Sequence, residues 1–315
     1  MEFPRHLLEL ETLTRAQIEA LLGLASTFKR ERALARAGGD GQTDRRGLLR
    51  GRTIVTLFFE NSTRTRSSFE VAARALGADV LSFQKDASSV AKGESLEDTV
   101  RNLDAIGVDA MVLRHPAAGA PRLVVRAVRS SVINAGDGAH EHPTQGLLDA
   151  LSLRERWGTL EGKTVAIVGD ITHSRVARSN IHCLTKLGAR VRVGGPSTLI
   201  PLGIEKLGCT VARSLREALT GADAVMALRI QNERIADARL PGARDYARTW
   251  GLNARTLEML PRDALVLHPG PVNRGVELSS DVLDGPRSLV MDQVDSGVAV
   301  RMATLALCLR TEAGP

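Results

Sequence analysis

A run of hydroxyl and guanidinium side chains stands where a strand-like segment gives way to a helical pattern. Residues 52–59 are largely apolar or β-branched, and the run Ser62–Arg66 that follows contains three hydroxyls and two arginines. The first turn of a helix offers unpaired N–H groups and the positive end of the helix dipole. These groups together predict a site for a phosphate-sized anion that needs no metal. A serine-capped helix with solvated arginines is the alternative that this run alone leaves open.

Other polar side chains follow strand-like segments farther along the chain. Arg114 ends one such segment, and His142 and Gln145 stand at the start of a helical pattern. Arg175 and Arg229 occupy similar places in the second half. Arginine pairs with carboxylates through two parallel hydrogen bonds, so two arginines suit a ligand with two acidic groups. A lone histidine beside a proline is more often structural than catalytic, but the place of His142 just before a helical pattern favours a functional role.

Strand-like and helical segments alternate over most of the chain, which is typical of parallel sheets covered by helices. The predicted class is α/β, with two doubly wound parallel-sheet domains of similar architecture joined by interdomain helices. The first domain is expected at residues 1–143 and the second at residues 144–291, with a C-terminal helix at about 292–315 packing back on the first. Expected strands lie at residues 52–59, 79–83, 109–113, 131–134, 163–168, 190–193, 222–228 and 264–267. Expected helices run from a capping box at Thr14 and Gln17 to about residue 32, and over residues 63–76, 96–106 (capped by Ser95 with Asp98), 122–129, 144–156, 175–187 and about 296–309.

Composition limits the partners that this chain can have. Its 315 residues carry a formal charge of +6, yet only 3% are aromatic and the arginines are scattered. Small anionic ligands therefore fit better than nucleic acid, although a nucleic-acid binder stays open on charge alone. No stretch approaches the roughly 20 apolar residues needed to cross a bilayer, and the start of the chain lacks the apolar core of a signal peptide. We therefore expect a cytoplasmic protein without membrane contact. Cys183, Cys209 and Cys308 are far apart, and we expect them to be reduced, buried and unable to hold a metal.

The run Ser62–Arg66 resembles the carbamoyl-phosphate motif shared by the aspartate and ornithine carbamoyltransferases. Further parts of that family's pattern follow in order at residues 92–94, 113–116, 142–145, 229–231 and 268–275, so the resemblance covers nearly the whole chain. It implies an enzyme that transfers the carbamoyl group of carbamoyl phosphate to the α-amine of L-aspartate. The products would be N-carbamoyl-L-aspartate and phosphate, a step of de novo pyrimidine biosynthesis. Neither a cofactor nor a covalent intermediate is implied.

The resemblance also implies roles for individual residues. The expected carbamoyl-phosphate ligands are Ser62, Thr63, Arg64, Thr65, Arg114, His142 and Gln145, with Ser88 as a further contact. Among these, Arg64, Thr65, Arg114 and His142 would be catalytic, because negative charge develops on the carbonyl oxygen and the departing phosphate. The expected aspartate ligands are Lys92, Arg175, Arg229, Gln231, Gly270 and Pro271. The residues suggest no base for the attacking amine, and the leaving phosphate can take its proton.

Aspartate is favoured over ornithine because Arg175 and Arg229 suit two carboxylates, whereas an ornithine site would need an acidic partner for the side-chain amine. The His-Cys-Leu-Pro type of motif expected of ornithine enzymes is missing, and Gly270–Pro271 stands in its place with an expected cis bond. In the family, the loop that matches Ser88 and Lys92 enters the neighbouring subunit's site. The resemblance thus implies a homotrimer with shared sites. It leaves open a larger assembly with a dihydroorotase or regulatory chains.

Two other classes are weighed against this interpretation. The strand-like run at residues 165–168 opens onto a helix, as in dinucleotide-binding proteins, but Gly169 is not followed by the further glycines that pyrophosphate requires. A P-loop is absent as well. A non-catalytic ligand-binding protein on the same scaffold is the remaining alternative. The completeness of the arginine and histidine set argues against it.

Overall fold

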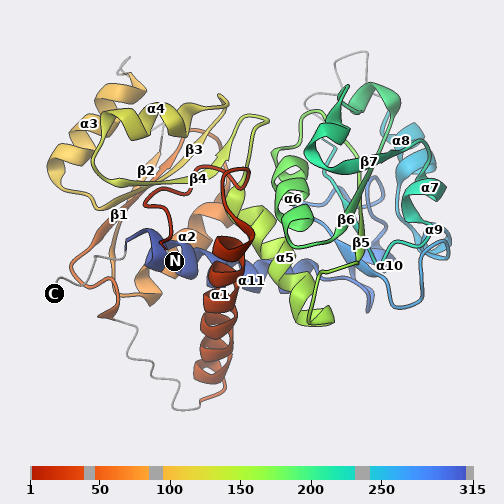
Figure 1. Cartoon of the computed structure of the whole chain (residues 1–315), viewed down its shortest axis with the longest axis horizontal. Helices are drawn as coiled ribbons and strands as arrows, with labels where there is room; N and C mark the ends of the chain where they lie inside the picture. Colours follow the sequence, from red (N-terminus) through yellow and green to blue (C-terminus); the bar gives the residue numbers. More distant parts are fainter. Residues whose placement is uncertain (1, 39–46, 85–94, 231–241, 310–315) are drawn as a thin grey trace. The chain divides into compact units, whose positions relative to one another are not determined.

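The computed structural model describes residues 2–38, 47–84, 95–230 and 242–309 (Figure 1). Its contacts divide the chain into two compact units, one formed by Met1–Leu151 with Asp295–Pro315 and the other by Ser152–Val294. The first division falls inside helix α5 (Pro143–Trp157) and the second inside helix α11 (Val290–Cys308). Each of these two helices therefore contributes residues to both units.

The first unit is built on a parallel sheet of four strands in the order β2-β1-β3-β4. Leu57 of β1 lies beside Phe83 of β2 and Leu113 of β3, which fixes the register across the centre of the sheet. The strands and the helices that connect them are α1 (Arg15–Arg36), β1 (Thr53–Phe58), α2 (Thr63–Ala75), β2 (Asp79–Gln84), α3 (Leu96–Ile106), β3 (Ala110–His115), α4 (Ala120–Ala127), β4 (Ser131–Asp137) and α5.

Both faces of this first sheet are buried, as parallel strands require. Val55 and Met111 point to the face where they pack in one cluster with Val100 of α3 and Val124 of α4. Ile54 precedes Val55 in β1 and so points to the opposite face, and it is also almost completely buried. Figure 1 shows α3 and α4 together on one side of the sheet. Because both faces are buried, the strands appear in the sequence as continuous apolar runs.

Helix caps in the first unit agree with the expected ones. Thr14 accepts a hydrogen bond from the Gln17 amide while the Gln17 side chain accepts one from the Thr14 amide, which completes the capping box of α1. Ser95 likewise accepts from the amide of Asp98 and begins α3. Helix α1 continues to Arg36, farther than expected, because the strong helix formers alanine and leucine fill its last turn.

The second unit contains a parallel sheet of five strands in the order β7-β6-β5-β8-β9. One face packs on Leu219, Tyr246 and Trp250, while helix α6 contacts the sheet through β6. The strands and helices are β5 (Thr164–Val168), α6 (Arg175–Lys186), β6 (Arg190–Gly194), two short 3-10 helices (Ser197–Leu199 and Ile204–Leu207), β7 (Cys209–Ala212), α7 (Leu215–Leu219), β8 (Ala224–Ala227), α8 (Ala243–Trp250), α9 (Ala254–Leu257), β9 (Leu265–Leu267), α10 (Ser280–Leu283) and α11.

The sequence missed several short elements of the second unit. Strand β7 and helices α7 to α10 were not expected, and all but α8 have at most five residues. Such short segments carry too few residues to show a period. Helix α11 begins at Val290, whereas the sequence predicted a start near residue 296. Its first turn was obscured because two aspartates, Asp292 and Asp295, interrupt the apolar run.

Two further observations concern the cysteines and the apolar helices. Cys183, Cys209 and Cys308 are free and buried. Among the described residues, no helix combines the length and the apolar character needed to cross a bilayer.

Candidate functional site

In the first unit, polar residues stand at the carboxyl ends of three neighbouring strands. Ser62 and Thr63 follow β1, Arg114 lies in the last part of β3, and His142 follows β4. The chain leaves β1 towards β2 and returns on its other side as β3, so the strand order reverses between β1 and β3. Open α/β sheets bind ligands at such a reversal, outside the carboxyl ends of the strands.

The amino end of α2 forms the first part of this site. Ser62 is the N-cap residue, and its carbonyl accepts a hydrogen bond from the amide of Arg66 at 3.1 Å. Its hydroxyl makes no capping hydrogen bond within the described part of the chain. Thr63 and Arg64 are exposed, whereas Thr65 is buried. The hydroxyls and the first-turn amides of α2 can therefore serve an anion rather than the helix itself.

Charge in the first unit is concentrated around one carboxylate. Asp149 of α5 is completely buried, and it attracts the guanidinium groups of Arg64 and Arg301. Desolvation lowers the pKa of Arg64, and the attraction of Asp149 opposes this change. Burial, together with repulsion from Arg64 and Arg114, lowers the pKa of Arg301 to about 9, so Arg301 remains charged at neutral pH. Arg64 and Arg114 thus lie close enough to Arg301 to repel it, and Asp149 offsets part of this repulsion.

Arg301 comes from helix α11, where it is the single charged residue between Asp295 and Arg310. Its guanidinium carbon lies 5.0 Å from the centre of the Phe69 ring, an arrangement that favours a buried cation. A Cβ atom at Gly297, one turn earlier, would lie 2.5 Å from the Arg301 Nη1 atom. Glycine at this position therefore leaves room for the guanidinium to fold back along its own helix.

The loop between β4 and α5 is held by buried carboxylates, and this positions His142. The Asp137 carboxylate accepts hydrogen bonds from the amides of Gly119 at 2.7 Å and Glu141 at 3.2 Å. Its contact with His140 raises the pKa of that imidazole. The His142 side chain is buried, and its carbonyl accepts from the Gln145 amide at 2.9 Å. The two expected ligands therefore sit on a rigid corner.

Gln145 connects this corner to the arginine cluster. Its side-chain amide donates to Asp149 Oδ1 at 2.9 Å, and the same carboxylate attracts Arg64. Arg114 lies 3.4 Å from the Glu60 carboxylate, in the segment that follows β1. The first unit therefore contains five of the sequence-predicted residues in buried positions or in contact with carboxylates: Arg64, Thr65, Arg114, His142 and Gln145.

The second unit repeats this pattern of strand ends. Arg175 follows β5 as the first residue of α6, Arg229 follows β8, and Gly270 and Pro271 follow β9. These three strands are neighbours, and the strand order reverses between β5 and β8. The expected cis bond between Gly270 and Pro271 is confirmed. Both arginines thus flank the reversal, as Arg64 and Arg114 do in the first unit.

Local contacts position Arg175. Ser174 caps α6 by accepting from the Ala177 amide at 3.1 Å. The Asp170 carboxylate accepts from the His173 amide at 3.1 Å and contacts the His173 ring at 3.0 Å. A Cβ atom at Gly169 would meet the Leu228 Cβ atom at 3.0 Å, so glycine is needed where β5 passes the end of β8. The turn after β5 is consequently well defined.

Three predicted ligands, Ser88, Lys92 and Gln231, lie outside the described residues. Sequence reasoning also missed three buried groups that support the site: Asp149, Arg301 and Glu277. Asp149 follows Gln145 by one helical turn, which was a usable signal. Arg301 stands alone in an apolar helix, where an ionisable residue calls for a partner. Glu277 lies close after the motif at residues 268–275, but its burial could not be foreseen.

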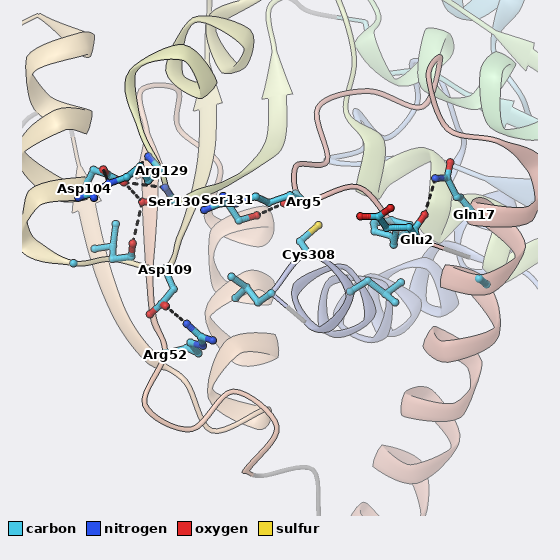
Figure 2. Close-up of a pocket in the computed structure, with 16 residues that line it drawn as sticks. Glu2, Arg5, Gln17, Arg52, Asp104, Asp109, Arg129, Ser130, Ser131 and Cys308 are labelled. Carbon is cyan, nitrogen blue, oxygen red and sulfur yellow. Dashed lines mark hydrogen bonds and ion pairs between the residues drawn. The ribbon is translucent and has the colours of Figure 1, made fainter. Parts of the chain in front are cut away.

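A separate cavity of about 920 Å³ lies at the opposite edge of the first sheet (Figure 2). Its lining includes Arg52, Asp109 and Ser130, which directly precede β1, β3 and β4. Arg52 pairs with Asp109 at 2.5 Å, and Ser130 donates to Asp104, as the dashed lines in Figure 2 show. These groups satisfy one another, and none of the sequence-predicted ligands lines this cavity.

The strand orders and the arginines at the strand ends define a doubly wound α/β protein suited to small anionic ligands. Comparison with known proteins makes this class specific. The family description "Aspartate/ornithine carbamoyltransferase, carbamoyl-P binding domain" matches residues 5–155, and the description "Asp/Orn binding domain" of the same family matches residues 161–308. The chain therefore belongs to the aspartate/ornithine carbamoyltransferase family.

Relatives and solved structures agree with this assignment. An aspartate carbamoyltransferase catalytic subunit from Anaeromyxobacter sp. (strain Fw109-5) is 57% identical over 306 residues, covering 96% of this chain and 94% of its own length. Aspartate transcarbamoylase from Trypanosoma cruzi, solved with carbamoyl phosphate and aspartate, has a TM-score of 0.84 at 32% identity, covering 97% of this chain and 95% of its own. Ornithine carbamoyltransferase from Pyrococcus furiosus has a TM-score of 0.85 at 30% identity, covering 96% of each chain.

Proposed function

We propose that this chain transfers the carbamoyl group of carbamoyl phosphate to the α-amine of L-aspartate. A C–N bond forms as the amine attacks the carbamoyl carbon, and the bond from that carbon to the phosphate oxygen breaks. The products are N-carbamoyl-L-aspartate and phosphate, and the amine proton can leave with the phosphate. This is the reaction for which the Anaeromyxobacter relative is named, and the Trypanosoma structure holds its two substrates.

The observation that carries the proposal is the placing of arginines at the reversal of strand order in each unit. Arg64 and Arg114 flank it in the first unit, and Arg175 and Arg229 flank it in the second. We assign the first unit to carbamoyl phosphate and the second to aspartate. Pre-placed donors stabilise the charge that develops on the carbonyl oxygen and the phosphate, and one such donor is typically worth about 10²- to 10³-fold in rate.

Within the first unit, Ser62, Thr63 and Thr65 supply hydroxyls for the phosphate. His142 and Gln145 face the carbamoyl group in this proposal. The small exposure of His142 and Thr65 supports such roles, because buried donors act in a low dielectric. The proposed mechanism therefore depends on positioning and charge, with no covalent intermediate on the chain.

Aspartate is the better co-substrate on local chemistry. An ornithine side-chain amine would need an acidic partner at the strand ends of the second unit. Among the residues of this unit that the structure describes, the buried acids at the strand ends already accept hydrogen bonds: Asp170 from His173, and Glu277 from Ile230 and Asn273. Similarity of fold does not separate the two substrates, since the TM-scores to the aspartate and ornithine enzymes are 0.84 and 0.85.

A colorimetric assay for carbamoyl aspartate tests this function directly. The purified chain should form product from carbamoyl phosphate and L-aspartate, and it should form no citrulline when L-ornithine replaces aspartate. Phosphate release should match carbamoyl aspartate formation one to one. Product from ornithine, or no product from either amine at saturating carbamoyl phosphate, would refute the proposal.

We further propose a homotrimer in which Ser88 and Lys92 act in the neighbouring subunit. The edge strand β2 and helix α2 expose apolar side chains, Leu81 at 44% and Val71 at 46%, and such residues suit a subunit contact. Mixed trimers of Lys92→Ala and His142→Ala subunits should regain activity, because some hybrid sites would be complete. No recovery after verified subunit exchange would exclude shared sites.

A further inference from the structure

One buried carboxylate in the second unit joins two segments that are distant in sequence. Glu277 Oε1 accepts a hydrogen bond from the amide of Ile230 at 2.7 Å and another from the Asn273 side chain at 2.7 Å. Glu277 Oε2 accepts from the amide of Asn273 at 2.9 Å. The Asn273 side chain also donates to the carbonyl of Ile230 at 2.9 Å. The segment after β8 and the segment after β9 are thereby tied at one point.

The two tied segments are those that carry the proposed aspartate ligands. Ile230 directly follows Arg229, and Asn273 follows Gly270 and Pro271 closely. The Glu277 side chain has no exposed surface, so these hydrogen bonds are formed away from water. An acceptor lost here would leave a donor unsatisfied.

The groups around Glu277 indicate that its carboxylate serves mainly as a hydrogen-bond acceptor rather than as one half of an ion pair. The His268 Nε2 atom lies 4.0 Å from Glu277 Oε2, and the Tyr246 side chain is buried nearby. Burial raises the pKa of Glu277, while the hydrogen bonds from Ile230 and Asn273 oppose this change and stabilise the ionised carboxylate. A carboxylate therefore occupies this place because several N–H groups converge on it.

We propose that Glu277 is a positioning residue for aspartate binding, which holds the Arg229 segment and the Gly270–Asn273 loop at a fixed separation. Glu277 acts through these backbone segments and does not contact the substrate. This inference rests on the proposed carbamoyl transfer to aspartate. It predicts that weakening the Glu277 contacts lowers aspartate affinity selectively, because the carbamoyl-phosphate residues belong to the other unit.

Glu277→Gln is the sharpest test, since it preserves shape and replaces one acceptor oxygen with an N–H donor. In its best orientation the new amide would face the Asn273 N–H, donor against donor. The KM for aspartate should rise tenfold or more. The KM for carbamoyl phosphate should change little, while the Tm should fall by a few degrees because the buried Asn273 N–H loses its acceptor. Asp284→Asn is the matched control, because Asp284 pairs with exposed Arg274 next to the same loop without contacting Ile230.

Asn273→Ala provides a second variant that keeps Glu277 and removes the side-chain bridge to Ile230. It should raise the KM for aspartate in the same direction. An unchanged aspartate KM in a folded Glu277→Gln enzyme overturns the proposal, and so does an equal change in both KM values. If Glu277→Gln does not fold, an unchanged KM in Asn273→Ala overturns it, and unfolding of both variants shows a stability role instead. A wild-type chain that makes no carbamoyl aspartate would refute the proposed function itself.

Discussion

The two units place arginines in the same topological position but support them in different ways. In the first unit, Arg64 and Arg114 both repel Arg301, and the carboxylates of Asp149 and Glu60 compensate only part of the charge of these three arginines. In the second unit, Glu277 accepts hydrogen bonds from the backbone N–H of Ile230, which follows Arg229, and from the side-chain amide of Asn273. The difference suits the proposed ligands. A phosphate dianion is held by accumulated positive charge, whereas an amino acid with two carboxylates requires a defined separation between its partners.

The largest expected effect concerns the arginines of the first unit. Arg64→Ala and Arg114→Ala should each lower kcat by at least about 10²- to 10³-fold, because a donor to the developing charge is lost. Steady-state rates at saturating substrates measure this effect. Arg74→Ala is a suitable control, since Arg74 is on the same helix as Arg64 with a side chain 60% exposed. Near-normal turnover of Arg64→Ala would contradict the assignment of the phosphate site.

The arginines of the second unit should respond differently. Arg175→Ala and Arg229→Ala should raise the KM for aspartate by roughly 10- to 100-fold, since charge-assisted hydrogen bonds to carboxylates are lost. Inorganic phosphate should still inhibit both variants with an unchanged constant, because it binds in the first unit. Arg248→Ala serves as the control, as its side chain is 78% exposed. Equal weakening of phosphate and aspartate would remove the distinction between the units.

Arg301→Met tests whether accumulated charge supports the first unit. A unit charge roughly 10 Å from another contributes about 1.7 kcal/mol at an effective dielectric constant of about 20. The KM for carbamoyl phosphate should therefore rise on the order of tenfold, and the Tm should fall as well, because the buried Asp149 carboxylate loses one of the guanidinium groups that compensate it. Arg32→Met removes another poorly exposed arginine of this unit and should leave the KM unchanged. Loss of stability without a change in KM would make Arg301 a purely structural residue.

The smallest effect is a dependence of stability on pH. The hydrogen bond to Asp137 raises the pKa of His140 above its ordinary 6.5. The stabilisation is therefore complete below pH 6.5 and is lost as the pH rises through the raised pKa. The Tm of the wild type should fall over that range relative to His140→Gln, which lacks the titrating ring. Parallel Tm profiles for the two proteins would show that this contact contributes nothing.

Much of the fold was predictable because local signals were strong. The helix that begins after Ser95 was predicted with its exact bounds, since a capping serine and a following glycine mark both ends. Strand β7 was missed because its four residues include exposed Thr210 and follow a glycine-bounded turn. The predicted anion site at Ser62–Arg66 does lie at a strand-to-helix junction. Its support by Asp149 and Arg301 was missed, because both residues are separated from it by long stretches of chain.

The sequence by itself determined the alternation of strands and helices and the residue types at the strand ends, because periodicity, caps and motifs are local properties. Tertiary structure decided which strands are neighbours, and this places Arg64 and Arg114 at one reversal of strand order and Arg175 and Arg229 at the other. It also decided which charged groups are buried. The chain hints at the positions of Asp149 and Arg301, but only packing from distant segments removes these two residues and Glu277 from water and gives them partners.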